Sequence, residues 1–247
     1  MRSANSWFNN LEELKEANRE YFELEEKDGV VLAQDWGKKE PYSKRFRLFT
    51  NFEEAVLYVS DQVEGRLGIP ALYEYIGVVN QTQKPYFDVD IPKEKLDDPY
   101  LVVDNLVSTL DLLLKDFQEE HELKACVYET VYFDKEDLVG PAEKHSFHVV
   151  VNGIRFANNL DMFAFGQKVK SAMNDEFSPY IDPIWTTYRQ MRLLGSSKKG
   201  KFSAKSFFYA RKLDGNSPVE KGDLFSKKNL RESMITEPKG AIISRIP

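Results

Sequence analysis

Cysteine is almost absent from this 247-residue chain, whose only thiol is that of Cys126. A single cysteine excludes an intrachain disulfide and any zinc module built from several thiolates. No apolar run follows the N-terminal methionine, which predicts that the chain has no signal peptide. These absences favour an intracellular, reducing compartment such as the cytoplasm.

Long apolar runs are also missing. No stretch approaches the ~18 apolar residues of a membrane helix, so we expect no membrane partner. No Gly-x-x-x-x-Gly-Lys-Ser/Thr sequence occurs, which excludes a P-loop ATPase within these residues. The chain is 42% hydrophobic and 30% charged, which is typical of an ordinary globular protein with one sizeable domain or two small lobes.

The charge is unevenly distributed. The net charge is −6, yet residues 183–213 contain basic residues and no acidic ones. The basic residues of this run are Arg189, Arg192, Lys198, Lys199, Lys201, Lys205, Arg211 and Lys212. One basic surface on an acidic body attracts polyanions such as nucleic acid. The same run is also compatible with a solvated loop.

Hydrophobic periodicity and cap residues predict the elements along the chain. We expect helices at 8–27, from Asn51, from Pro99 to about Glu120, and from Asn158 or Asn159 to about Phe177. We expect strands at 30–33, 45–49, 85–91, 124–133, 144–151 and 205–211, with a polar loop at 134–143. From residue 85 onward this is the βαββαβ order of a split-βαβ, RRM-like sheet.

The prediction is therefore an α+β fold. Residues 1–225 would form a single domain, in which residues 1–80 are an N-terminal α/β lobe and residues 81–225 an RRM-like lobe with a mostly antiparallel sheet. Residues 226–247 would be a C-terminal extension or linker, because they are polar and charged.

Two of the predicted strands have polar residues at alternate positions, so these side chains share a face. Asp88 and Asp90 do so on one strand, and Lys144, Ser146 and His148 on the other. Neighbouring carboxylates repel unless a cation is present, and Mg²⁺ or Mn²⁺ favours hard oxygen ligands. A cation, a hydroxyl and an imidazole suit phosphate oxygens. Each motif alone also fits a salt-bridged surface pair or a structural histidine.

A third group of residues lies before and within the basic run. Asp182 offers another carboxylate, and three carboxylates can hold two divalent ions. Arg192 lies between the apolar Met191 and Leu193, where a cation is costly without an anionic partner. The turn at residues 195–197 can bring backbone N–H groups towards an anion.

In combination and order, these elements resemble the archaeo-eukaryotic primase superfamily, specifically the primase-polymerases and the herpes–pox type viral primases. The resemblance covers residues 85–201 and rests on Asp88-Val89-Asp90, on Ser146-Phe147-His148 with Lys144 ahead, and on Asp182 followed by Arg189-Gln190-Met191-Arg192-Leu193 and Ser196-Ser197-Lys198. It implies the primase fold, with the N-terminal lobe packed on the RRM-like catalytic lobe. The zinc module of many relatives has no counterpart here, which favours primer elongation over initiation.

Carried over to this sequence, the resemblance implies primase and DNA polymerase activity by a two-metal mechanism. Mg²⁺ or Mn²⁺ would be held by the catalytic residues Asp88, Asp90 and Asp182. The incoming dNTP or NTP would be held by Lys144, Ser146, His148, Arg189, Arg192 and Lys198. A 3′-hydroxyl would attack the α-phosphate of that nucleotide, releasing pyrophosphate.

The partners implied are a single-stranded DNA template and a primer. We expect DNA contacts from Lys199, Lys201, Lys205, Arg211 and Lys212. In many viral relatives this domain is the N-terminal part of a primase-helicase, so an attached helicase or other replisome proteins are further candidate partners. A viral protein would act in the host cytoplasm or nucleus.

Two other functions stay open. A metal-dependent nuclease, or another nucleotidyltransferase, would use the same carboxylates, and a nuclease would degrade DNA. A non-catalytic module for single-stranded nucleic acid would call for exposed aromatic residues on the RRM-like sheet, whereas the face with Asp88 and Asp90 is charged.

Overall fold

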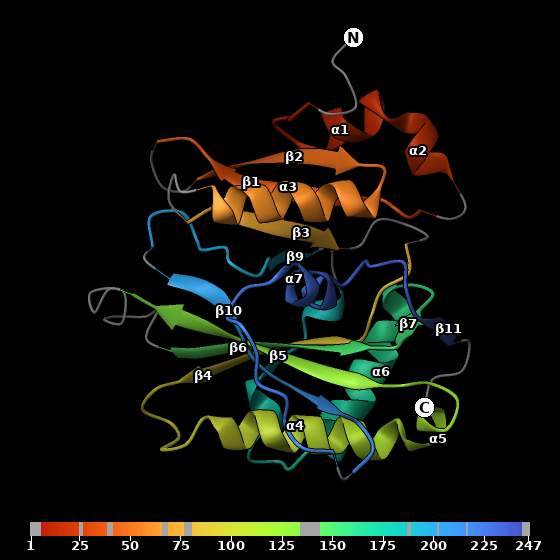
Figure 1. The fold of residues 1–247 in the computed structure, drawn as a ribbon, viewed down its shortest axis with the longest axis vertical. Helices are drawn as coiled ribbons and strands as arrows, with labels where there is room; N and C mark the ends of the chain where they lie inside the picture. The colour runs from red at the N-terminus through yellow and green to blue at the C-terminus, as the bar shows by residue number, and fades with distance from the viewer. Residues whose placement is uncertain are drawn as a thin grey trace.

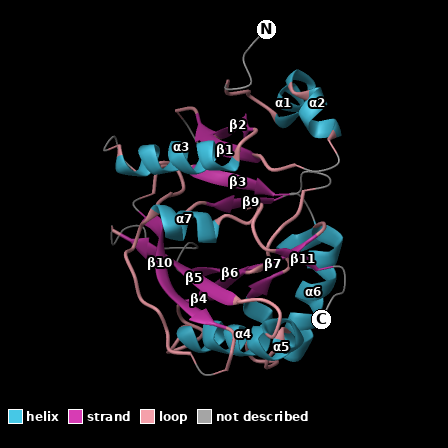
Figure 2. Ribbon diagram, turned by 45° about the vertical axis from the view of Figure 1, so that its right-hand side comes forward, coloured by secondary structure: helices cyan, strands magenta, loops and turns pink. Residues whose placement is uncertain are grey.

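The computed structural model describes residues 6–24, 27–38, 42–65, 69–76, 81–133, 144–186, 189–201, 203–215 and 217–243. Two β-sheets are stacked along the long axis of the molecule, with helix α7 (Lys227–Ser233) between them (Figures 1 and 2). The predicted loop at 134–143 lies outside the described residues. None of the described helices is long and apolar enough to cross a membrane.

The upper sheet forms the N-terminal lobe and has the strand order β2-β1-β3-β9, with all neighbours antiparallel. Its strands are β1 (Val30–Trp36), β2 (Ser43–Phe49), β3 (Leu72–Ile76) and β9 (Arg189–Arg192). Residues of β1 alternate between two cores, so Val31 packs with α1 (Leu11–Ala17) and Leu32 packs with α3 (Phe52–Glu64). Strand β9 comes from residues predicted for the other lobe, so the two lobes are not contiguous in sequence.

The N-terminal helix differs from the prediction. Residues 8–27 do not form one helix; they contain α1 and a short α2 (Arg19–Glu23), which meet at Asn18. The side-chain amide of Asn18 donates to the Leu14 carbonyl at 2.8 Å, so a local side-chain bond replaces helix continuation. Phe8 instead forms a bridge with Phe46 of β2.

The lower sheet has the strand order β10-β5-β6-β4-β8. Its strands are β4 (Tyr86–Pro92), β5 (Lys124–Tyr132), β6 (Lys144–Asn152), β8 (Ile181–Asp182) and β10 (Ser203–Lys212). Helix α4 (Tyr100–Leu113), followed by α5 (Lys115–Gln118), connects β4 to β5, and α6 (Asn159–Ala172) connects β6 to β8 through β7 (Ile154–Phe156). This is the split-βαβ arrangement, and the predicted α+β class with mostly antiparallel sheets is confirmed.

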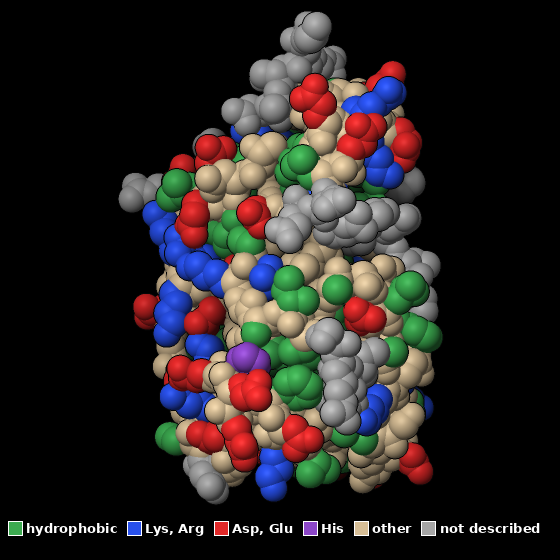
Figure 3. Space-filling model, turned by 90° about the vertical axis from the view of Figure 1, so that its right-hand side faces the viewer, with side chains coloured by type: hydrophobic (Ala, Val, Ile, Leu, Met, Phe, Trp, Pro, Cys, Tyr) green, Lys and Arg blue, Asp and Glu red, His purple; other side chains and the backbone are tan. Residues whose placement is uncertain are grey.

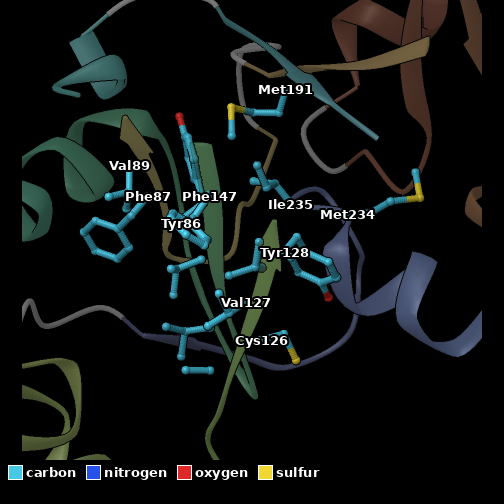
Figure 4. Close-up of a cluster of buried hydrophobic side chains, with 14 of the residues drawn as sticks. Tyr86, Phe87, Val89, Cys126, Val127, Tyr128, Phe147, Met191, Met234 and Ile235 are labelled. Carbon is cyan, nitrogen blue, oxygen red and sulfur yellow. The ribbon is translucent and has the colours of Figure 1, made fainter. Parts of the chain in front are cut away.

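Helices α4 and α6 cover one face of the lower sheet (Figures 1 and 2). Phe87, Val89 and Ile91 of β4 are fully buried, and the Phe87 ring contacts those of Phe165 on α6 and Trp185. Because side chains alternate along a strand, Asp88 and Asp90 leave the opposite face, towards the N-terminal lobe. Figure 4 shows how buried side chains of β4, β5, β6 and β9 and of the segment after α7 contribute to one core.

Residues 226–243 were expected to be an extension or a linker, but they are folded onto the core. They contain α7 and β11 (Ala241–Ile243), which pairs in parallel with β7. The backbone N–H groups of Ile235 and Thr236 both donate to the buried carboxylate of Glu74 on β3, at 2.8 Å. Glu237 forms a buried ion pair with Lys84, just before β4, at 2.5 Å. This segment therefore joins the two sheets.

Candidate functional site

The strand register brings the predicted carboxylates together on β4 and on the edge strand β8 of the lower sheet. Asp88 on β4 lies directly opposite His148 on β6 and opposite Asp182 on β8. Asp90 lies opposite Ser146. Residues paired across antiparallel strands project from the same face, so all five residues belong to the face that looks towards the N-terminal lobe.

The surroundings of Asp88 and His148 shift the pKa values of both side chains. Burial, reinforced by the nearby Asp90, raises the pKa of Asp88 to about 6, although Lys205 and Lys144 act in the opposite direction. Burial, together with the neighbouring Lys205, Arg192 and Lys144, lowers the pKa of His148 well below its usual range. The imidazole is therefore neutral at pH 7, and its Nε2 lies 3.6 Å from Oδ1 of Asp88.

Two lysine side chains place positive charge beside the aspartates. Lys144 forms an ion pair with Asp90. Lys205 of β10 is only 1% exposed and donates to the carbonyl oxygen and to Oγ of Ser146, at 3.0 and 3.2 Å. The prediction that Lys205 contacts DNA from an exposed basic run is therefore corrected, because its ammonium group lies inside the site.

The upper sheet also contributes to this site. Arg192 on β9 lines a cavity of about 10 Å³ together with His148 and Lys205, which is roughly the space of one water molecule. Burial and the nearby Arg192 and Lys144 lower the pKa of Lys198. Arg192 thus lies beside the predicted phosphate-binding residue His148, and Lys198 is near enough for Lys144 to affect its pKa.

Arg189 is not brought to the same place. It is exposed, and its Nε donates to the Ile184 carbonyl at 3.4 Å. It lies three residues before Arg192 on one strand, so the two side chains leave opposite faces. Of the predicted nucleotide-binding set, Lys144, Ser146, His148, Arg192 and Lys198 gather, and Arg189 does not.

The carboxylates fit a divalent cation in their chemistry. Oδ1 of Asp88 and Oδ1 of Asp90 are buried and have no hydrogen-bond partner among the described residues, and such oxygens are the ligands that Mg²⁺ and Mn²⁺ prefer. Within the described part of the chain, however, no three His, Cys, Asp or Glu side chains are arranged so that they could already hold a metal. Asp182 is aligned with Asp88 by register, but the three aspartates are not a preformed ligand set.

The basic run is divided by the fold. Lys199 lies in the loop after β9, where its Nζ donates to the Gly37 carbonyl beyond β1, and Lys201 is exposed nearby in sequence. Arg211 and Lys212 lie at the far end of β10, six and seven residues beyond Lys205, or roughly 20 Å at 3.3 Å per residue. Lys212 is paired there with Glu122 at 2.7 Å.

Acidic and basic side chains are distributed differently over one face of the molecule. On the face in Figure 3, acidic side chains are scattered, and basic side chains gather mainly towards one edge. A field that attracts polyanions therefore does not cover this whole face.

Sequence reasoning missed the role of two buried residues beside the site. Glu74 lines the same cavity as His148 and Arg192, and burial raises its pKa although Ile235 and Thr236 donate hydrogen bonds to it. Lys205 was assigned to the wrong partner. Neither residue has a local signal, since each depends on strands that pair over long distances in sequence.

Comparisons with known proteins give one relevant similarity. No family model matches the chain. A curated protein of African swine fever virus, provisionally named a helicase/primase complex protein, is 23% identical over 180 residues, which is 68% of this chain. The chain spans about 17% of the length of that relative. It is thus similar to part of a viral protein whose name refers to a helicase/primase complex.

Proposed function

We propose that this protein is a DNA primase-polymerase that transfers nucleotides to a primer on a single-stranded DNA template. The observation that carries the proposal is the row Asp182, Asp88 and His148 on adjacent strands, with Asp90 and Ser146 beside it. Two sheets bring carboxylates and cations to one small volume, which is the requirement for binding a metal–triphosphate complex. The similarity to the viral helicase/primase complex protein favours nucleotide transfer over the nuclease and the non-catalytic module.

Under this proposal, the chain's own residues have distinct roles. Asp88, Asp90 and Asp182 would hold Mg²⁺ or Mn²⁺, whose charge would stabilise the triphosphate and the leaving pyrophosphate. Because His148 is neutral at pH 7, it would bind a phosphate oxygen as an N–H donor rather than as a cation.

The cationic side chains would surround the rest of the triphosphate. Lys144 and Lys198 act as point charges, whereas Arg192 can bind two phosphate oxygens at once. Nε of Arg192 is buried without a hydrogen-bond partner in the described structure, so a donor is available for such a ligand. Lys205 orients the Ser146 hydroxyl, since it donates to Oγ of that residue.

A helicase is the partner that the similarity suggests. The relative's name refers to a helicase/primase complex, and the described chain matches only a part of that protein. We propose that the present domain works beside a helicase, supplied by the same polypeptide or by another.

The test is incubation with single-stranded DNA, labelled dNTPs or NTPs, and Mg²⁺ or Mn²⁺, with and without an annealed primer. We expect template-dependent extension of the primer. Asp88→Ala and Asp90→Ala should abolish extension while the circular dichroism spectrum is unchanged, because removing one of two like charges relieves repulsion in the metal-free protein.

The same assay separates the alternatives. Shortening of the labelled DNA that depends on Asp88 would identify a nuclease. DNA binding with neither extension nor cleavage, under both metals, would indicate a non-catalytic module. Substantial extension by either alanine variant would refute the metal assignment.

A further inference from the structure

An exposed tryptophan and a stacked arginine mark the end of β1 and the start of β2. Trp36, the last residue of β1, is 52% exposed. The guanidinium carbon of Arg45 lies 4.1 Å from the centroid of the Trp36 ring and 4.6 Å from that of Trp7. Gln34 accepts a hydrogen bond from Nε of Arg45 at 2.9 Å, which fixes the plane of the guanidinium group.

The stack continues along the same face of the upper sheet. The Trp7 ring lies 6.2 Å from that of Tyr58 on α3. The guanidinium group of Arg47 lies over Tyr58 and over Phe49, at 4.9 and 4.4 Å. Aromatic rings and guanidinium groups therefore alternate. We call Trp7, Trp36, Arg45, Arg47 and Tyr58 the aromatic–arginine surface.

In the described part of the chain, no carboxylate neutralises the charge of this surface. Among the described residues, neither Arg45 nor Arg47 has an ion pair with a carboxylate. Nε of Arg47 is buried without a hydrogen-bond partner in the same set. Two arginines that have no carboxylate partner among the described residues lie beside a half-exposed indole. They provide the two features that single-stranded nucleic acid needs, namely positive charge for the backbone and a ring for base stacking.

This surface meets the loop after β9 at the end of β1. The backbone N–H of Lys199 donates to Asp35 at 3.4 Å, and Asp35, which precedes Trp36, leaves the other face of β1. The loop after β9 also pairs with β10 beside the site, since the N–H of Gly195 donates to the carbonyl of Lys205 at 2.7 Å and the Lys205 ammonium group donates to Ser146. Lys198 lies three residues further along this loop. The next residue, Lys199, donates to the carbonyl of Gly37, which follows Trp36 directly. Lys199 also lies over the Tyr42 ring, 5.0 Å from its centroid. A strand that leaves the site past Lys199 would turn round the end of β1 to reach Trp36.

We propose that the aromatic–arginine surface binds single-stranded polynucleotide, with a base stacked on Trp36 and phosphates near Arg45. The alternating rings and cations match bases and phosphates, and they favour this ligand over an apolar protein segment. The inference deepens the proposed function, because the bound strand would be the template outside the active site. The binding itself requires neither nucleotide nor catalysis.

The test measures binding of fluorescent oligo(dT) to the intact protein by anisotropy, in EDTA and without nucleotide. Stacking on one ring accounts for roughly a fivefold or larger change in affinity, so Trp36→Ala should weaken binding by about fivefold to tenfold or more. Trp36→Phe keeps a ring and should retain most of the affinity. Arg45→Met should flatten the dependence of log affinity on log salt by roughly 0.7 if it removes one phosphate contact.

Leu112→Ala is the matched control, because Leu112 is an exposed apolar residue of α4, at the opposite end of the molecule (Figure 1). It should bind oligo(dT) like the wild type. Tryptophan emission gives a second readout. Quenching by oligo(dT) should be reduced in Trp36→Phe, and the part that remains should come from Trp7 of the same surface, since Trp185 is buried.

The outcomes separate this inference from the proposed function. If primer extension occurs but Trp36→Ala and Arg45→Met bind oligo(dT) like the wild type, the inference is wrong and the proposed function stands. If these variants lose affinity and no extension is found, the surface binds nucleic acid and the polymerase proposal fails. Equal losses in Trp36→Ala and Leu112→Ala would also overturn the inference.

Discussion

Replacing Asp88 with asparagine tests the electrostatics of the site without any assumption about substrate. The change keeps the shape of the side chain and removes its charge. Burial and Asp90 raise the pKa of Asp88 from 3.8 to about 6, whereas the unfolded chain titrates near the ordinary value. Between these two pKa values the folded protein therefore binds a proton that the unfolded protein does not bind.

The sign and size of the effect follow from that difference. Protonation of Asp88 favours the folded state fully at about pH 4 and below, and this contribution is lost as the pH rises through 6. A shift of about two units corresponds to roughly 3 kcal/mol at 1.36 kcal/mol per unit, and the Asp88 side chain is only 21% exposed. Asp88→Asn avoids the cost of ionisation. Its free energy of unfolding should exceed that of the wild type by on the order of 2–3 kcal/mol at pH 7.5 and by about 1 kcal/mol at pH 4.5.

The assay is urea denaturation of both proteins in EDTA between pH 4.5 and pH 8. Comparing the two proteins cancels the titration of all other carboxylates. The difference in unfolding free energy should rise between the two pKa values, 3.8 and about 6, with a midpoint near pH 5, and should level off above pH 6. Added Mn²⁺ should stabilise the wild type more than the variant. A difference that stays constant across the pH range would show that Asp88 does not have the burial and the acidic neighbour described above.

Three further predictions concern other parts of the molecule. His148→Ala and Arg192→Ala should each weaken nucleotide binding about tenfold or more, since a hydrogen bond to a charged group contributes roughly 1.5–3 kcal/mol. Both variants should leave the affinity for oligo(dT) nearly unchanged. Loss of oligo(dT) affinity with unchanged nucleotide affinity would instead place these residues on the template path. The double substitution Lys199→Gln/Lys201→Gln should lower DNA affinity and flatten the dependence of log affinity on log salt by roughly 0.7 per lost contact. An unaltered dependence would show that these lysines belong to a solvated loop. Lys84→Met should reduce the free energy of unfolding by about 3–5 kcal/mol in urea titrations, because it leaves a buried carboxylate without its cation; a loss below about 1 kcal/mol would contradict the buried ion pair.

The strands that carry the site were predictable because their side chains alternate. Phe87, Val89 and Asp88 follow a strict period of two, and such a pattern has only one face that can be buried. The same alternation in β6 placed His148 on the correct side. The N-cap of helix α6 at Asn158 was also predictable, and the Asn158 side chain accepts hydrogen bonds from the N–H groups of Leu160 and Asp161.

The pairing of strands that are distant in the sequence could not be predicted from their side-chain pattern. Strand β9 has only four residues, Arg189–Arg192, and nothing in so short a segment specifies that it joins β3 of the upper sheet. The burial of Lys205 follows from the partner that β10 chooses, not from its own neighbours. Helix α7 has a charged sequence in which Leu230 is the only large apolar residue, so its docking depends on contacts made elsewhere.

The hydrogen bonds from the segment after α7 to Glu74 have a consequence for the order of events during synthesis. Ile235 follows Glu74 by 161 residues, which a ribosome adds in roughly 8–30 s at 5–20 residues per second. During that interval, Glu74 lacks the N–H donors that it has in the finished protein. Since Glu74 and Ile235 line the same cavity as His148 and Arg192, the site is completed only after this late segment has left the ribosome.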